Sequence, residues 1–214
     1  MTRATFESIP IVENDDPLVD LKEYPFVIEA SYFNQGLSGA STLKLRKGVA
    51  DKLAQIQQSF EGKYRFKIWD GHRPREVQDA IYNAYYKKLA QENPEWDEAE
   101  LHYATEQFVT KATNRKRIPP HATGGAVDLT LVDEHEEELD MGTEFDFFGP
   151  EAAPFYFQDR AFSELIHGNR LILREAMIAS GFTPDEDEWW HFDYGDQLWA
   201  LRADKPEAFY SEAT

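Results

Sequence analysis

Two short segments of the chain carry side chains that could bind a metal ion and use it. His121 and Asp128 lie seven positions apart in PPHATGGAVDLTL, and Glu188 and His191 lie three apart in EWWH. Two histidines and one aspartate can hold Zn²⁺ at three corners of a tetrahedron and leave the fourth for water. Glu188 is a further carboxylate that could take the proton from that water. The combination predicts a metallohydrolase.

The metal ligands must be nitrogen and oxygen atoms, because the chain has no cysteine. Neutral imidazoles and a carboxylate suit zinc when thiolates are absent. Zinc held in this way can lower the pKa of its bound water to about 7, which makes hydroxide available at neutral pH. Gly124 and Gly125 lie between His121 and Asp128 and would permit the tight backbone path that brings both side chains to one ion.

Glu188 and His191 need a bend in the chain to face the same ion. Residues three apart share a face on a helix but point to opposite faces on a regular strand, and the run WWHFDY is strand-like. We therefore expect a bend or bulge near Glu188. Each of these residues alone has a plainer interpretation, as a packed or surface histidine or as a salt-bridge partner. The two patterns together, with the glycines, favour the metal site.

The segments that must position these residues mix helices and strands without regular alternation. Val49, Leu53 and Ile56 recur at helical spacing, whereas KYRFKIW alternates apolar side chains as a strand does. Expected helices cover residues 43–60, 74–91, 97–113 and 160–180. Expected strands cover residues 27–33, 63–69, 126–132 and 189–194. This pattern favours an α+β fold with a central, mostly antiparallel sheet flanked by helices.

Size and composition limit the class of protein. The chain has 214 residues, 42% of them hydrophobic and 14% aromatic, so we expect one globular domain over residues 1–214. The net charge of −18 argues against a nucleic-acid or anionic-membrane partner, because phosphates would be repelled. We find no signal-peptide pattern and no apolar run of membrane-spanning length, so we expect a cytoplasmic protein.

Four segments resemble the zinc D-alanyl-D-alanine dipeptidases, which are related to the vancomycin-resistance dipeptidase and more distantly to hedgehog and lysostaphin-type peptidases. They are WDGHRP, HATGGAVDLTL, MGTEFD and EWWHFDY, and the likeness runs in the same order from about Asn34 to Tyr194. The family pattern S-x-H-x-x-G-x-A-x-D is matched from His121 to Asp128, and E-x-W-H is matched at Glu188 and His191. The resemblance implies a hedgehog/D-Ala-D-Ala peptidase-like fold.

The resemblance also implies roles for individual residues. It places one zinc ion per chain on His121, Asp128 and His191. It makes Glu188 the general base and acid. Arg73, in the D-G-x-R-P segment, would stabilise the oxyanion, since a fixed guanidinium donates hydrogen bonds to developing negative charge. Asp146, at the end of MGTEFD, would anchor the free ammonium group of the substrate, which needs a counter-charge when buried.

Two positions depart from the family pattern. Pro119 stands two residues before His121, where the family has a serine that helps to bind the substrate amine in the resistance enzymes. The breadth of substrates is therefore open, although the metal site is not affected. His72 stands beside Arg73, where the dipeptidases often carry tyrosine. His72 is a candidate substrate contact, with an orienting or solvent-facing role as the alternative.

The function expected from this resemblance is zinc-dependent hydrolysis of D-Ala-D-Ala or a closely related small dipeptide, by metal-activated water with Glu188 as general base. Such a metallopeptidase would act in cell-wall or peptidoglycan metabolism. One alternative is a D,D- or L,D-carboxypeptidase that acts on peptidoglycan stem peptides. Another is a zinc-binding interaction module without catalysis, against which Glu188 and Arg73 both argue. The oligomeric state is open.

The substrate pocket has aromatic candidates for its walls. Phe147 and Phe148 follow Asp146, and Trp189 and Trp190 follow Glu188. Any of the four could line a pocket for small side chains, but for at least half of them core packing is the better expectation.

Overall fold

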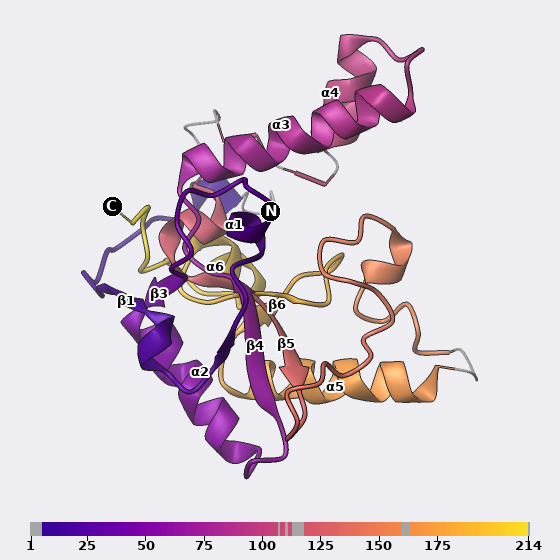
Figure 1. Ribbon diagram of the computed structural model, residues 1–214. Coiled ribbons are helices and arrows are strands. Elements are labelled where there is room, and N and C mark those ends of the chain that lie inside the picture. The colour runs from indigo at the N-terminus through magenta and orange to yellow at the C-terminus, as the bar shows by residue number, and fades with distance from the viewer. Residues whose placement is uncertain (1–5, 107, 110, 113–117, 160–162, 214) are drawn as a thin grey trace.

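A five-stranded sheet lies at the centre of the computed structural model, which describes residues 6–106, 108–109, 111–112, 118–159 and 163–213 (Figure 1). The strand order is β2–β4–β5–β7–β6. Its members are β2 (Val27–Ile28), β4 (Arg65–Asp70), β5 (Ala126–Val132), β7 (His191–Asp193) and β6 (Thr183–Pro184). Only the β2–β4 pair is parallel, and the other neighbours are antiparallel. The predicted mostly antiparallel sheet is confirmed.

The middle strand, β5, is buried along its whole length. Its neighbour β4 carries the alternation seen in KYRFKIW, with Phe66 and Ile68 fully buried. A strand that is buried on both faces needs cover on both, and β5 is buried throughout although Asp128 and Thr130 interrupt its apolar residues. A second, two-stranded antiparallel sheet pairs β1 (Leu18–Asp20) with β3 (Lys44–Arg46) beside this core.

Two amphipathic helices flank the central sheet. Helix α2 (Lys47–Ser59) buries Leu53 and Ile56, and helix α5 (Glu164–Ala179) buries Leu173 and Met177. These side chains belong to the same hydrophobic core as Leu129 of β5. The predicted α+β arrangement, with helices packed on a central sheet, is thereby confirmed.

Helices α3 (Arg75–Glu92) and α4 (Glu98–Glu106) form an arm that extends away from the sheet (Figure 1). The two helices pack on each other. The smaller helices are α1 (Ser31–Asn34), α6 (Gln197–Arg202) and four 3₁₀ turns: η1 (Phe6–Ser8), η2 (Leu21–Glu23), η3 (Pro120–Thr123) and η4 (Pro150–Ala152). None of the helices formed by the described residues is long and apolar enough to cross a membrane.

Three expected elements differ from the structure at their ends. The strand expected over 27–33 stops at Ile28, because the ladder to β4 ends there and residues Ser31–Asn34 turn into α1. The helix expected from residue 43 begins at Lys47, because residues 44–46 pair with β1 instead. The strand expected over 189–194 covers only His191–Asp193, since Trp189 and Trp190 lie in a turn.

The helix expected over 97–113 is observed only as α4, which ends at Glu106, and the described residues 108–109 and 111–112 are not helical. The other expected elements are confirmed apart from short differences at their ends, and the helix expected over 160–180 is observed as α5. Residues 107, 110 and 113 of the first, and residues 160–162 of the second, lie outside the described residues. Gly181 follows α5 with a φ of 90°, which is the left-handed conformation expected of a residue that ends a helix.

The loop that carries His121 returns into β5 through two glycines. Gly124 adopts a φ of 72°, a conformation that non-glycine residues rarely take. A Cβ atom on Gly125 would lie 2.4 Å from the carbonyl oxygen of Tyr194. That close approach is part of the β5–β7 pairing, because the N–H of Tyr194 donates to the carbonyl of Gly125. The expectation of a tight path at these glycines is confirmed.

We expect Gly125→Ala to lower the free energy of unfolding by about 1–3 kcal/mol, because the new methyl group must push two paired backbone segments apart. Gly168→Ala is the matched control. Gly168 lies inside α5 with no atom within 4 Å of an added Cβ, so this change should stabilise the helix by about 0.5–1 kcal/mol. Urea denaturation of both variants measures the difference. Equal stability of the two variants would contradict the close-approach argument.

Candidate metal centre and catalytic cavity

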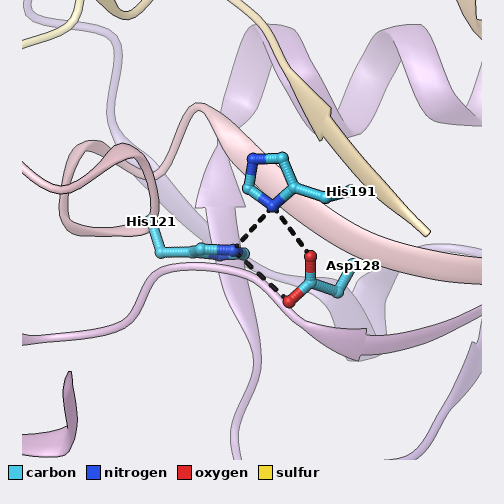
Figure 2. A group of neighbouring side chains, drawn as sticks. All are labelled: His121, Asp128 and His191. Atoms are coloured by element: carbon cyan, nitrogen blue, oxygen red, sulfur yellow. Dashed lines mark hydrogen bonds and ion pairs between the residues drawn. The ribbon is translucent and has the colours of Figure 1, made fainter. Parts of the chain in front are cut away.

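The three side chains predicted to bind metal converge in the structure (Figure 2). His121 Nε2 lies 3.2 Å from His191 Nδ1 and 3.3 Å from Asp128 Oδ2, and His191 Nδ1 lies 3.0 Å from Asp128 Oδ1. All three residues are buried. Residues 70 positions apart along the chain thus present one ligand atom each to a common point.

The second ring nitrogen of each histidine faces a hydrogen-bond acceptor. His121 Nδ1 lies 2.8 Å from the carbonyl oxygen of Gly71, and His191 Nε2 lies 2.8 Å from Asp193 Oδ1. A carbonyl or carboxylate oxygen accepts, so these outer nitrogens carry the protons and donate. In the form that binds a metal, the inner nitrogen of each ring would offer a lone pair, and these inner nitrogens face each other and Asp128.

This donor set fits a small divalent cation. The two histidine nitrogens lie 3.2 Å apart, and each lies 3.0–3.3 Å from a different oxygen of Asp128, so a cation between them would be held by acceptor atoms on three sides. Zinc bonds to nitrogen and oxygen of about 2.0–2.2 Å place neighbouring corners of a tetrahedron about 3.3 Å apart. The observed separations match that edge. His121, Asp128 and His191 are therefore the residues that could hold the metal.

The sheet register brings two of the three donors together. Asp128 on β5 pairs directly with His191 on β7. Its other neighbour across the sheet is Asp70, the last residue of β4. His121 reaches the same point from η3. Gly124 ends this turn in the left-handed conformation, and β5 begins two residues later. The candidate metal donors thus come from two adjacent strands and the turn that precedes one of them.

The bend expected near Glu188 is present. The chain turns at Trp189 and Trp190, and the N–H of His191 lies 3.4 Å from the carbonyl oxygen of Glu188. Asp185 holds the start of this turn, because its carboxylate accepts hydrogen bonds from the N–H groups of Asp187 and Glu188. The turn allows Glu188 and His191 to face the same cavity.

That cavity has a volume of about 950 Å³. Its lining includes all three metal donors. It also includes the three other side chains to which the resemblance gives roles in the reaction or in substrate binding, namely Arg73, Asp146 and Glu188. Six residues from four separate segments of the sequence therefore surround one space.

Arg73 is buried and held on several sides. Its Nε donates to Asp70 Oδ2 at 2.7 Å and one terminal nitrogen donates to Gln78 Oε1 at 2.8 Å. The guanidinium also lies over the ring of Tyr32, 4.7 Å from its centroid. Its other terminal nitrogen lies 3.4 Å from Asp128 Oδ2, which places it beside the metal donors. The guanidinium is a fixed cation next to the candidate metal site.

Burial changes the acidity of the two cavity carboxyl groups that are not metal donors. It raises the pKa of Glu188 to about 8, against the lowering effect of His191, and Asp128 and Asp185 add to the rise. Burial likewise raises the pKa of Asp146 to about 6, with a further contribution from Asp128. Asp146 adopts a φ of 58° and accepts a hydrogen bond from the Tyr32 hydroxyl at 3.2 Å.

Some of the other candidate residues line this cavity and some do not. Pro119 lines the cavity. His72 is absent from that lining and instead lines a neighbouring hollow of about 560 Å³, so its contact with substrate stays a prediction. Phe147 and Phe148 line the cavity. Trp189 and Trp190 do not, because both are buried in the hydrophobic core.

Several residues that matter at the site were not predicted. Asp193 is fully buried, accepts from His191, and also accepts from Arg202 at 2.6 Å. The spacing of His191 and Asp193 was a usable signal, because residues two apart on a strand share a face. Tyr32 and Gln78 had no such signal, since their partners Asp146 and Arg73 are brought to them only by the fold.

Comparison with known proteins places the chain among peptidases. A family model described as D-ala-D-ala dipeptidase matches residues 37–210. A D-alanyl-D-alanine dipeptidase of Synechocystis sp. is 29% identical, over 90% of this chain and 87% of the relative. A D-alanyl-D-alanine dipeptidase of Escherichia coli is 30% identical, over 69% of this chain and 64% of the relative.

Among solved structures, a zinc-bound mutant of the vancomycin-resistance D,D-pentapeptidase VanY from a VanB-type cassette covers 93% of this chain. The aligned region is 96% of that protein, with 16% sequence identity and a TM-score of 0.40.

Asp193 should set the affinity of the centre for metal without touching the metal. We expect Asp193→Asn to weaken Zn²⁺ binding by about 10–100-fold, because the amide no longer supplies the charge that orients His191 and raises the basicity of its ring. Competition with a chromogenic chelator measures the affinity. Asp204→Asn, an exposed change of the same kind, should leave it unchanged. A folded D193N protein that binds Zn²⁺ as tightly as the parent would refute this role.

Proposed function

This chain belongs to the D-Ala-D-Ala dipeptidase family of peptidases, and we propose that it hydrolyses D-Ala-D-Ala or a closely related small dipeptide with the help of one zinc ion. The observation that carries the proposal is the convergence of His121, Asp128 and His191 in a cavity that also holds Arg73, Glu188 and Asp146. The D configuration of the substrate comes from the family and from its named relatives.

Zinc is the metal that the donor set suits best. Two imidazoles and one carboxylate, without a thiolate, form the three-residue set typical of catalytic zinc sites with one open position. When bound, zinc would polarise the scissile carbonyl group and lower the pKa of water, so that a nucleophile forms at neutral pH. His121, Asp128 and His191 are the residues that would hold it.

Glu188 is the proposed general base and acid. The attacking water gives up a proton to the Glu188 carboxylate as its oxygen bonds to the carbonyl carbon. Glu188 then passes the proton to the leaving amine as the C–N bond breaks. A carboxyl group whose pKa is raised by burial holds a proton more readily than an exposed one. The turn between Glu188 and His191, which brings both residues to the cavity, supports this assignment.

Arg73 is the proposed stabiliser of the negative charge that develops on the carbonyl oxygen. Hydrogen bonds to Asp70 and Gln78 fix its guanidinium before substrate arrives. A donor that needs no reorganisation favours the transition state over the neutral carbonyl group. Its terminal nitrogen beside Asp128 supports the assignment, because the reacting carbonyl group must lie next to the metal.

Asp146 is the proposed anchor for the ammonium group of a free dipeptide. It lines the same cavity as Glu188 and is fixed by the Tyr32 hydroxyl. A peptide with an acylated amino group has no positive charge to offer this carboxylate, so an anchor here favours dipeptidase over carboxypeptidase activity. Pro119, in the cavity wall, has no hydroxyl or N–H group to contribute. Binding of the substrate's ammonium group therefore depends mainly on Asp146.

The alternatives are a carboxypeptidase and a metal-binding module without catalysis. A module needs neither a buried guanidinium nor a carboxyl group with raised pKa beside the metal donors. Cytoplasmic residence, which suits a free dipeptide substrate, stays a prediction from the sequence.

The decisive experiment is D-alanine release by the zinc-loaded full chain. We expect cleavage of D-Ala-D-Ala that stops on chelation, with little or no cleavage of N-acetyl-D-Ala-D-Ala or L-Ala-L-Ala. Cleavage of the acetylated compound at a similar rate would favour the carboxypeptidase instead. If none of the three compounds is cleaved, the proposed activity is wrong.

Replacing Glu188 separates catalysis from metal binding. Glu188→Gln should lower kcat by about 10²–10⁴-fold, the usual contribution of a positioned acid–base group, while the zinc content stays at one per chain. Glu186→Gln, two residues away and exposed, is the matched control and should keep the parent rate. An E188Q protein with the parent kcat would exclude Glu188 as the base.

The binding of the free dipeptide should depend on pH through Asp146. Its carboxyl group has a pKa of about 6, so it is charged above that pH and neutral below it. We expect the KM for D-Ala-D-Ala to rise as pH falls through about 6, because a neutral carboxyl group attracts the ammonium group less. In Asp146→Asn the KM should be high already at pH 8 and stay level. A parent KM that is constant from pH 8 to 5 would speak against the anchor.

A further inference from the structure

The catalytic cavity is larger than a substrate made of two alanines requires. Its volume of about 950 Å³ lies near the upper end of the roughly 300–1,000 Å³ typical of cavities that hold drug-sized ligands. Dialanine carries only two methyl side chains. The nature of the remaining lining therefore bears on which dipeptides the cavity can hold.

One wall of the cavity is apolar and largely aromatic. It is made by the α3–α4 arm, the residues around it and the segment that follows Asp146. We call this set the apolar wall, and its members are Ile81, Trp96, Tyr103, Phe108, Phe147 and Phe148. Tyr103 is 71% exposed, Phe108 46% and Phe147 41%. Apolar surface gathered in this way at a cavity marks a binding surface for an apolar group.

Part of the apolar wall, namely Ile81, Phe108 and Phe148, is held in place by packing. The ring of Phe148 lies 4.5 Å from that of Tyr85 and 5.4 Å from that of Phe108, measured between centroids. These contacts tie the segment after Asp146 to the arm. Ile81 is buried in a cluster with Tyr32 and Tyr82. A wall fixed before the ligand arrives loses little conformational entropy on binding.

The apolar wall lies next to the proposed ammonium anchor. Asp146 is followed directly by Phe147 and Phe148, and its positive φ turns the chain sharply at that point. Its partner Tyr32 packs in the same cluster as Ile81. In a dipeptide the free ammonium group and the first side chain are attached to the same Cα atom. The first side chain is therefore the one held closest to the wall.

We propose that the substrates of this chain include dipeptides whose amino-terminal residue carries a large apolar or aromatic side chain, which the apolar wall receives. This proposal rests on the dipeptidase function proposed above. It adds that the amino-terminal side chain is a main determinant of specificity, and that D-Ala-D-Ala fills the cavity only in part.

The test compares kcat/KM of the zinc-loaded full chain for D-Ala-D-Ala, D-Phe-D-Ala and D-Ala-D-Phe. We expect D-Phe-D-Ala to exceed D-Ala-D-Ala by about tenfold, the factor that partial burial of a phenyl ring supplies. D-Ala-D-Phe should show no such gain, because its ring is attached to the residue farther from Asp146.

Variants of the apolar wall give a second readout. Tyr103→Ala and Phe147→Ala should each lower the ratio of kcat/KM for D-Phe-D-Ala over D-Ala-D-Ala by about threefold or more. Leu165→Ala is the matched control. Leu165 lies on α5, is 70% exposed and does not line the cavity. It should leave both rates and their ratio unchanged.

Each of the other outcomes overturns a stated part of the proposal. If D-Ala-D-Ala is cleaved but D-Phe-D-Ala is a poorer substrate, the specificity is wrong while the dipeptidase function stands. If D-Ala-D-Phe gains instead, the wall receives the carboxyl-terminal residue and the placement is wrong. If Y103A and F147A lower the ratio no more than L165A, the wall has no part in selection. If none of the dipeptides is cleaved, the dipeptidase function fails and the specificity fails with it.

Discussion

The convergence of two histidine side chains and one carboxylate on one buried point is the constraint on which the rest of this site depends. The inner nitrogens of His121 and His191 lie 3.2 Å apart, and each lies 3.0–3.3 Å from an oxygen of Asp128, in a buried place where polar groups are costly unless they are paired. Such an arrangement persists only when the backbone enforces it. Enforcement comes from the direct pairing of Asp128 with His191 across two strands and from the left-handed turn at Gly124.

Hydrogen bonds behind the donors connect the metal centre to the rest of the site. Asp193 accepts from His191 and from Arg202, and Arg202 also donates to Asp185. Asp185 in turn holds the first N–H groups of the turn that carries Glu188. One continuous chain of polar contacts therefore runs from His191, a candidate metal donor, to the backbone of Glu188, the proposed base. Because every member is paired, the network fixes both groups in one geometry.

The sequence allowed the local features to be predicted, whereas most contacts between distant segments could not be. The buried run in β5, the glycines after His121 and the need for a bend at Glu188 follow from rules that act over a few residues. The length of β2 and the strand at residues 44–46 both depend on pairing with segments that are distant in the sequence. The local patterns therefore predicted the wrong end for the strand and the wrong start for the helix. The Tyr32–Asp146 hydrogen bond joins residues 114 positions apart, and no local pattern encodes it.

The α3–α4 arm has a particular place in the chain. It is inserted between β4 and β5, which are neighbours in the sheet and pair directly with each other (Figure 1). The two ends of the insertion are therefore fixed by strand pairing, whatever lies between them. Helices in such a position can lengthen, shorten or exchange side chains during evolution while the strand register that holds Asp128 and His191 stays intact. Under the proposed function, substitutions on α4 would change which dipeptides are accepted while the pairing of Asp128 with His191 is kept, whereas α3 also carries Gln78, which holds Arg73.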